Sequence, residues 1–405
     1  MQKYVISHKS QRIVGFLILI YVVMYTYLYI IDSMIANYFA LTIFAGAYID
    51  SILLKRKKIH INMPVLFYLL FLFLSMLSFF WTVSEEAYID ALPRNLFFMI
   101  MTISIYNILF WYDVKKYLLW GIVVGGIINF AVYCNLLPFP LPVFEGQTRF
   151  SGTLGNSNEM GVFISFSIFA TTLLVNFFKN SRFSKVILFV YTPLSFYLLF
   201  QTGSRTSILF GYSFLILFFV SYVKTKKGLL YLGTLSLVML VGFNYLMQDD
   251  EFANQLRFVS ERFEGARETI EGRASEGSTQ QRLYFIKEGI KLWKDRPFLG
   301  YGNRSYSYLW GTYAHNNYVE ILVNTGVFGF VLFYLFYLFT IVSVSKLNNR
   351  NLKIHGLFFL FASLALIEFG RVYNMNAIYI IIIIMLSTLH SGKESTPEVL
   401  GCDVK

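Results

Sequence analysis

The sequence has little of the residue types that mark a soluble or a disulfide-bonded protein. Only two of its 405 residues are cysteines, Cys134 in an apolar run and Cys402 near the end, so neither a disulfide framework nor a cysteine metal cluster is expected. Charged residues make up 14% of the chain, whereas 56% is hydrophobic and 19% aromatic. With a mean hydropathy of +0.57, this composition is typical of a polytopic membrane protein.

Long apolar runs recur along the whole chain. A helix needs about 20 apolar residues to cross the hydrocarbon core, and the seventh and eleventh runs are close to the lower limit of roughly 17. No small-residue cleavage site follows the first run, so we expect it to remain as an anchor. The predicted transmembrane helices cover residues 12–31, 34–54, 64–81, 93–112, 116–137, 159–178, 185–201, 206–223, 229–247, 316–345, 354–369 and 372–390.

These runs predict an all-α membrane protein of about twelve transmembrane helices with one long extracytoplasmic loop. The predicted organisation is five N-terminal transmembrane helices in 1–148, core helices six to nine in 149–247, the loop in 248–314 with an amphipathic helix over 279–296, helices ten to twelve in 315–390, and a cytoplasmic tail in 391–405.

Basic residues are distributed unequally among the loops. If the amino terminus is cytoplasmic, 20 of the 34 Lys and Arg residues fall on cytoplasmic segments, and every internal loop on that side carries some. The short outer segments receive only Arg94, Arg149, Arg205 and Arg371, and the long outer loop balances ten basic with ten acidic residues. The positive-inside bias counts short loops, so both termini are predicted to be cytoplasmic. The net charge of +11 therefore reflects topology and does not indicate nucleic-acid binding.

The short outer segments carry arginine but no lysine, which allows two interpretations. In the first, each arginine reaches from a helix end to the lipid headgroups. In the second, several arginines converge on a diphosphate, because a guanidinium offers a planar fork of donors that matches phosphate and keeps its proton. For Arg371, which follows Glu368 by three residues, a local ion pair is the alternative.

Arg205 lies in a short polar turn, Q-T-G-S-R-T-S, between two apolar runs. Gly203 permits a tight backbone there, and Ser204, Thr206 or Ser207 can cap the helix that follows. A turn this short should hold the guanidinium at the mouth of the helix bundle.

Arg149 begins the segment R-F-S-G-T-L-G-N-S-N-E-M-G, which leads into the sixth apolar run. Asn156 or Ser157 can cap that helix. Asparagine and serine also suit sugar hydroxyls, so Asn158 is a candidate for substrate contact as well as for a structural role.

The long loop divides into two parts. Residues 249–277 are charged with little periodicity, and we expect a mobile or partly helical cover. In the second part, Ser278 and Gln281 form a capping-box pattern, and Pro297 ends the helical spacing. The apolar residues at that spacing are Leu283, Ile286, Ile290 and Trp293.

Arg282 belongs to this amphipathic helix. At about 100 degrees per residue it lies beside the apolar face, close to Ile286 and Trp293. An arginine held against an apolar surface needs an anionic partner, so Arg282 is a candidate for anion binding.

His315 begins the tenth apolar run, with Asn316, Tyr318 and Glu320 in the first turns. A histidine at this position can be a helix cap or an interfacial residue. Its pKa also suits general-base catalysis near neutral pH, and it is predicted on the same side of the membrane as the outer arginines.

The order of these motifs resembles the O-antigen ligase and polymerase superfamily of bacterial envelope enzymes. The resemblance rests on T-G-S-R at 202–205, an arginine followed by a helix with tryptophan, P-x-x-G-x-G at 297–302, and H-N-N-Y-x-E-x-L-x-x-x-G-x-x-G at 315–329. The segment R-F-S-G-T-L-G-N-S-N is similar to the start of the family's core region, although a proline is common there at the position of Ser157. The resemblance covers about residues 149–330.

The resemblance implies a GT-C-like, metal-independent, inverting glycosyltransferase that uses an undecaprenyl-diphosphate-linked glycan at the outer face of the cytoplasmic membrane. It implies that Arg205 and Arg282 bind the diphosphate and that His315 activates or orients the acceptor hydroxyl. No cofactor is implied, and a chain-length regulator and a flippase are candidate partners. Residues assigned to substrate contact by position are Arg149, Asn158, Asn316, Tyr318 and Arg371.

Three functions are compatible with this pattern. A polymerase extends a lipid-linked repeat unit into capsule, exopolysaccharide or O-antigen, and a ligase moves the finished glycan to lipid A-core or to protein. The polymerase is favoured because the aromatic, isoleucine-rich and lysine-rich sequence indicates an AT-rich genome, and such polymerases vary greatly in sequence; neither point excludes a ligase. A transporter or flippase for a lipid-linked sugar is the third, although the polar residues lie near one face and no inverted repeat is evident.

Overall fold

A computed structural model of the chain describes residues 8–28, 33–53, 55–145, 149–177, 182–222, 226–273, 277–368 and 377–389. Nearly all of this part is helical, which confirms the all-α prediction. The exception is a short antiparallel pair, β1 (Phe144–Glu145) with β2 (Arg149–Phe150), which the sequence pattern did not predict. This hairpin begins the segment that leads to the sixth apolar helix.

The helical elements follow in chain order. They are α1 (His8–Leu28), α2 (Ser33–Leu53), α3 (Met63–Leu77), η1 (Ser78–Trp81), α4 (Glu85–Trp111), α5 (Lys115–Tyr133), η2 (Gly152–Leu154), α6 (Ser157–Phe177), α7 (Arg182–Gln201), α8 (Arg205–Tyr222), α9 (Lys226–Leu246), α10 (Asp250–Ile270), α11 (Gly277–Asp295), α12 (Ser305–Trp310), α13 (Asn317–Ser345), α14 (Arg350–Ala362), the π-helical turn η3 (Ser363–Ile367) and α15 (Ala377–Thr388).

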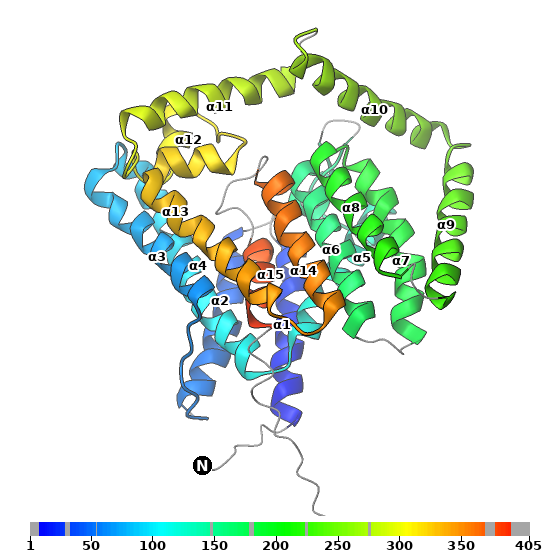
Figure 1. Cartoon of the computed structure of the whole chain (residues 1–405), viewed down its shortest axis with the longest axis horizontal. Coiled ribbons are helices and arrows are strands. Elements are labelled where there is room, and N and C mark those ends of the chain that lie inside the picture. The colour runs from blue at the N-terminus through cyan, green and yellow to red at the C-terminus, as the bar shows by residue number, and fades with distance from the viewer. Residues whose placement is uncertain are drawn as a thin grey trace, which may run out of the picture.

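The apolar helices stand together as a bundle, and α10 and α11 arch across one end of it (Figure 1). The start of α1 lies at the opposite end, and the short α12 lies beneath α11. Within the bundle, α1 packs on α5, α3 on α13, and α6 on α5, α7 and α8. We refer to the end covered by α10 and α11 as the arch end.

A helix lies at each of the twelve predicted positions. In the described part of the chain, seven of these stretches are long and apolar enough to cross a membrane, which confirms a polytopic membrane protein. They are Gln11–Leu28, Met63–Trp81, Glu85–Trp111, Lys115–Tyr133, Ser157–Val175, Asn317–Ser345 and Arg350–Ile367. The helix α15 is shorter, and each of its residues is buried, so it fills the centre of the bundle and does not face lipid.

Local sequence signals explain where several helices begin. Ser84 accepts a hydrogen bond from the amide of Ala87, and two glutamates follow in the first turn of α4, where negative charge offsets the helix dipole. Asn62 caps α3 in the same way and Pro64 occupies its first turn. The predicted start of the fourth span, residue 93, therefore falls inside a longer helix.

The loop between α11 and α12 is joined to a kink in α13. Gly326 has φ 64° and ψ −167° within that helix, a region open essentially to glycine, and a β-carbon there would overlap the backbone of Phe298. The amide of Tyr301 donates to the carbonyl of Val323 at 2.8 Å. The kink thus supplies carbonyl groups to the loop, which sets the position of α12 and of the segment before α13.

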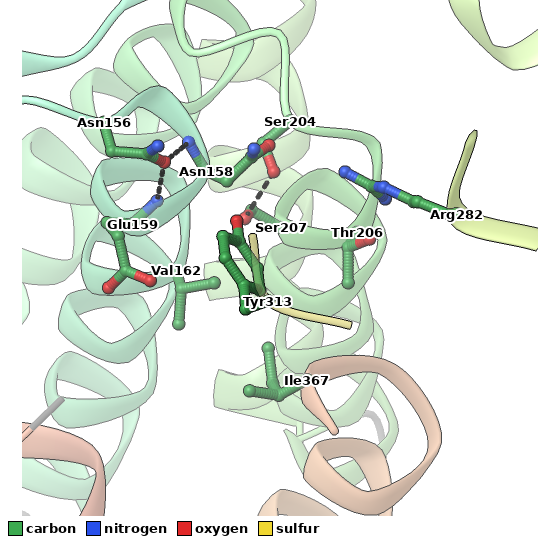
Figure 2. A pocket seen from close by; sticks show the side chains of 10 residues that line it. All are labelled: Asn156, Asn158, Glu159, Val162, Ser204, Thr206, Ser207, Arg282, Tyr313 and Ile367. Atoms are coloured by element: carbon green, nitrogen blue, oxygen red, sulfur yellow. Dashed lines mark hydrogen bonds between the residues drawn. The ribbon is translucent and has the colours of Figure 1, made fainter. Parts of the chain in front are cut away.

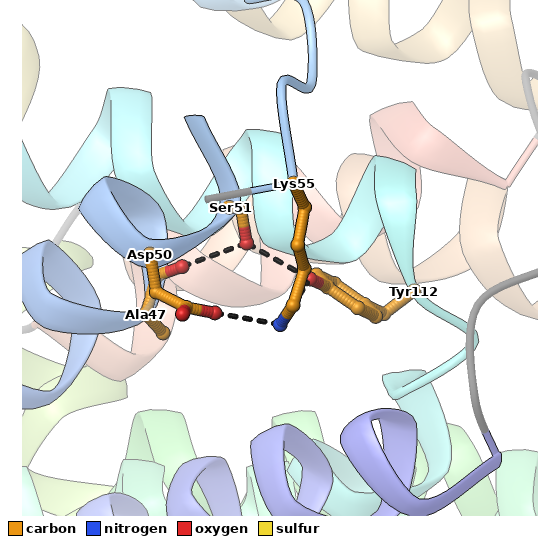
Figure 3. A network of polar contacts seen from close by, with 5 residues as sticks. All are labelled: Ala47, Asp50, Ser51, Lys55 and Tyr112. Atoms are coloured by element: carbon orange, nitrogen blue, oxygen red, sulfur yellow. Dashed lines mark hydrogen bonds and ion pairs between the residues drawn. The ribbon is translucent and has the colours of Figure 1, made fainter. Parts of the chain in front are cut away.

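A polar network joins α2 to the end of α4 at the end of the bundle away from the arch (Figure 3). Lys55 Nζ lies 2.6 Å from Asp50 Oδ2, and the hydroxyl groups of Ser51 and Tyr112 lie 2.8 Å apart. Because the ion pair is partly exposed, it contributes at most about 1 kcal/mol. Its main effect is to hold the basic segment 55–58 against the bundle.

The prediction that residues 249–277 have little periodicity is wrong for most of that segment. The helix α10 is regular and amphipathic, and Phe252, Gln255 and Val259 are buried at helical spacing. Gln255 Nε2 donates to the carbonyls of Phe200 and Gln201, which fixes α10 over the end of α7. The many charged residues between these positions obscured the pattern.

The predicted amphipathic helix over 279–296 is observed as α11, and only part of its predicted apolar face packs on the bundle. Leu283 and Ile290 are exposed, whereas Phe285 and Gly289 are buried. A β-carbon at Gly289 would overlap Val319, so α11 approaches α13 at this glycine. Ile286 and Trp293 pack at the side of the contact, as expected. The side chain of Ser278, predicted to cap this helix, lies outside the described side chains.

Candidate functional site

The turn between α7 and α8 is as tight as its sequence predicts. Gly203 has φ 58°, in the left-handed region that glycine adopts without strain. The hydroxyl groups of Ser204 and Ser207 lie 2.8 Å apart, and the amide of Ile208 donates to the carbonyl of Ser204. Arg205 is the first residue of α8 and so lies at the arch end of the bundle.

Three arginines from distant parts of the sequence meet at this turn. Arg149 donates through Nε to the carbonyl of Thr202 at 3.1 Å, and Arg262 on α10 donates to the carbonyl of Gly203. Arg205 in turn donates to the backbone carbonyl of Arg262. These hydrogen bonds go to neutral oxygens, so they leave the positive charge of the three groups in place. We call Arg149, Arg205 and Arg262 the arginine cluster.

The arginine cluster is linked to its surroundings on two sides. Arg205 donates to Thr279 Oγ1 on α11 at 3.2 Å, and Arg149 donates to Asn158 Oδ1 on α6 at 3.1 Å. The loop helix α11 and the start of α6 are thereby held at the same turn. Arg262 was not predicted, although its spacing from Phe252 and Val259 on one helix contained the signal.

A polar pocket of about 380 Å³ of empty volume, part of it open to solvent, lies beside the cluster. Figure 2 shows Arg282 reaching from α11 toward Ser204 and Thr206, with Asn158 and Glu159 across from it. The lining residues are Asn156, Asn158, Glu159, Val162, Ser204, Thr206, Ser207, Arg282, Tyr313 and Ile367. A guanidinium with hydroxyl, amide and carboxylate groups can bind a phosphate and sugar hydroxyls together.

His315 lies in the segment that leads from α12 to α13, next to the pocket residue Tyr313. The centroids of these two rings are 3.9 Å apart, and the ring of Phe285 stacks on His315 at 6.4 Å. In the described part of the chain, Nδ1 of His315 is buried without a hydrogen-bond partner. The backbone of His315 has φ 53°, a left-handed conformation that is uncommon for a residue with a side chain.

Burial, and then the positive charge of Arg282, lower the pKa of His315 from 6.5 to about 4. The imidazole is therefore uncharged at neutral pH and can accept a proton. Arg282 is thus close enough to His315 to act on its charge.

The other residues predicted to contact substrate lie outside the pocket lining or outside the described part of the chain, except Asn158. Asn316 caps α13 by accepting from the amide of Val319 at 3.1 Å, and the hydroxyl of Tyr318 donates to the carbonyl of Leu364 at 2.7 Å. Neither lines the pocket. Arg94 is half-buried on α4. Arg371, and the predicted cytoplasmic tail over 391–405, lie outside the described residues.

Glu368, the carboxylate of the possible local ion pair with Arg371, is buried, and that ion pair stays untested because Arg371 lies outside the described residues. Glu368 accepts hydrogen bonds from the hydroxyls of Tyr334 and Tyr337 at 2.9 Å each and from Tyr379 at 3.0 Å. The side-chain amide of Asn317 also donates to Glu368, and the backbone amide of Asn317 donates to its carbonyl. Glu368 thus fixes the start of α13, two residues after His315.

Part of the chain is similar to a known protein family. Residues 190–334 match the family model described as O-Antigen ligase. A comparison with curated proteins finds no match to the chain. The matched part contains Arg205, Arg282 and His315, whereas Arg149 and Asn158 precede it.

The chain is therefore a multi-pass membrane protein whose residues 190–334 are similar to the O-antigen ligase family. Members of this family are glycan-transferring enzymes, ligases or polymerases, of bacterial envelope polysaccharide biosynthesis.

Proposed function

We propose that the protein is a polysaccharide polymerase that transfers a glycan from an undecaprenyl-diphosphate-linked donor to a lipid-linked repeat unit. The observation that carries the proposal is the meeting of the T-G-S-R turn, Arg282 and the segment of His315 at one polar pocket. These are the motifs on which the family resemblance rests, and they come from three separate parts of the sequence.

Arg205 and Arg282 are proposed to bind the donor diphosphate. Arg205 contacts α11 at Thr279, which lies about one helical turn before Arg282 on that helix. Fixed positive charge at this place stabilises the negative charge that develops on the departing diphosphate. The residues proposed for sugar or phosphate contact are Arg149 and Asn158, and by position in sequence Asn316, Tyr318 and Arg371.

His315 is proposed to take the proton of the acceptor hydroxyl or to orient that hydroxyl. In the transfer, the acceptor oxygen forms a bond to the anomeric carbon of the donor while the bond from that carbon to the diphosphate oxygen breaks. The bonding electrons leave with undecaprenyl diphosphate, and the imidazole of His315 receives the proton. The diphosphate beside Arg282 offsets the guanidinium charge, the smaller of the two causes that lower the pKa of His315, so donor binding strengthens the base.

The proposed topology is the one that the charge distribution predicts. Twelve membrane-spanning helices in a GT-C-like arrangement, with both termini in the cytoplasm, place the arch end at the outer face of the cytoplasmic membrane. The arginine cluster then faces the side where lipid-linked repeat units are consumed. Reaction of an externally added cysteine reagent with a cysteine placed at Tyr308 of intact cells tests this orientation.

An O-antigen ligase is the second candidate function, because the matching family model carries that description. The donor side of the site is the same in both, and only the acceptor differs. A lipid-linked sugar transporter is the third candidate, and it uses the arginines for binding alone.

A purified-protein assay separates the three. The protein in lipid nanodiscs is supplied with lipid-linked repeat units, and products are separated by length. Longer glycan with release of undecaprenyl diphosphate establishes the polymerase. Transfer only when lipid A-core is added establishes the ligase, and no transfer by a folded preparation that binds donor rejects both enzymes.

A further inference from the structure

Aromatic side chains continue outward from His315 along α11 and α12. Beyond Phe285, which stacks on His315, the ring of Trp310 lies with its centroid 6.4 Å from that of Phe285 and 5.8 Å from that of Tyr284. The rings of Tyr284 and Trp310 are perpendicular. Tyr313 joins this group to the pocket, because it lines the pocket and contacts His315.

This group has a closed floor and an open edge. Phe285 is 8% exposed, whereas Tyr284 is 50% exposed. Gly311, directly after Trp310, has no atom within 4 Å of the position that a β-carbon would take, apart from its chain neighbours, so the space at Gly311 is open. The indole N–H of Trp310 is buried and makes no hydrogen bond in the described part of the chain, so Trp310 can offer only its ring to a ligand.

The helix α11 sets the order of these features. Thr279 contacts Arg205, Arg282 follows one turn later at the pocket, and Phe285 follows one further turn later against His315. At 1.5 Å per residue, the phosphate-binding and aromatic ends are separated by about 9 Å, with His315 coupled to both. An acceptor must bring its hydroxyl to His315 from beyond the diphosphate, which is where the aromatic group lies.

We propose that Tyr284, Trp310 and Tyr313, over the floor of Phe285, form an acceptor subsite that binds a hexopyranose residue of the incoming glycan. The subsite rests on the proposed function, since an acceptor exists only if the protein transfers glycan. A pyranose presents an apolar face of C–H groups that fits an aromatic ring, while its hydroxyls reach the hydroxyl groups of the tyrosines. The arginine side of the pocket offers charge and no such platform.

The test uses an acceptor that cannot act as donor, an alkyl glycoside of the repeat unit without diphosphate. In nanodiscs with saturating donor, Tyr284→Ala should raise the KM for this glycoside about tenfold. The slow hydrolysis of the donor, which releases undecaprenyl diphosphate, should stay unchanged. Tyr308→Ala is the matched control, because Tyr308 is 55% exposed on α12 and makes no ring contact in the described part of the chain.

Equal effects of Tyr284→Ala and Tyr308→Ala would mean that the rings only anchor the protein in the membrane interface, and this would overturn the subsite. A wild-type KM in Tyr284→Ala with normal polymerisation would overturn it as well and leave the proposed function intact. If the wild-type protein transfers no glycan, binding is measured directly by quenching of tryptophan fluorescence with the glycoside and Trp310→Phe as the blank. Quenching that Tyr284→Ala weakens then supports a sugar site on a protein that is not the proposed enzyme.

Discussion

The electrostatic coupling between Arg282 and His315 can be measured without any knowledge of the sugar. A group with a pKa of about 4 is protonated in about one molecule in a thousand at neutral pH, so the free protein holds His315 uncharged. Burial is the larger cause of the lowering and Arg282 the smaller. Arg282 thus accounts for less than half of it, which corresponds to less than about 20-fold in proton affinity.

Arg282→Gln removes the charge and should raise the pKa of His315 above its wild-type value but not to 6.5, since burial remains. Arg282→Lys keeps the charge and should leave the pKa low. Histidine ring nitrogens in labelled protein in nanodiscs report the titration by NMR, and His315→Asn identifies the signal. An unchanged pKa in Arg282→Gln, or an equal rise in Arg282→Lys, would refute the coupling.

Binding of an anion at Arg282 should raise the pKa of His315, as removal of the guanidinium charge does. Inorganic diphosphate bound at Arg282 offsets the guanidinium, so the pKa of His315 rises in the complex. The complex then holds more protons than the free protein, and the affinity for diphosphate increases as the pH falls through the pKa of the complex. In turnover, the acid limb of kcat/KM should lie near pH 4, as in the free protein, and that of kcat at higher pH.

Three further outcomes are expected. Arg205→Lys keeps charge but loses the fork, so turnover should fall by about 10- to 100-fold; near-normal turnover would leave only a general need for positive charge. His315→Ala should abolish transfer in the polymer assay while donor binding persists, and retained polymer would remove it from a catalytic role. Gly326→Ala should destabilise the protein by about 3 kcal/mol or more, because a β-carbon meets the backbone of Phe298 in a conformation restricted to glycine. Its control is Gly242→Ala on α9, where the β-carbon has open space; equal melting temperatures of the two variants would contradict the argument.

The function-bearing motifs could be predicted without coordinates because each is local. The T-G-S-R turn, the start of α13 at H-N-N-Y and the end of α11 before Pro297 depend on residues within a few positions of one another. Local spacing gave the wrong prediction for α10. Its charged residues hid the helical spacing of a face that is buried because Phe200 and Gln201 lie beneath it.

The sequence by itself determined which segments are helical and apolar, since backbone hydrogen bonds in a helix join residues four apart and burial in lipid demands long apolar runs. It also identified Arg205, Arg282 and His315 as candidates. Only the tertiary structure decided that Phe285 and Gly289, and not Leu283 and Ile290, form the inner face of α11. A helix buries the side that its neighbours cover, and those neighbours come from α12 and α13.

The tertiary structure likewise decided which groups share the pocket. Its lining comes from α6, the turn before α8, α11, the segment before α13 and η3, which meet only when the bundle is assembled. Arg262 and Glu368 acquired their positions in the same way, one against the T-G-S-R turn and one beneath the start of α13. Which charges and hydrogen-bonding groups meet at a site depends on their distances in three dimensions, and the spacing of residues along the sequence does not give those distances.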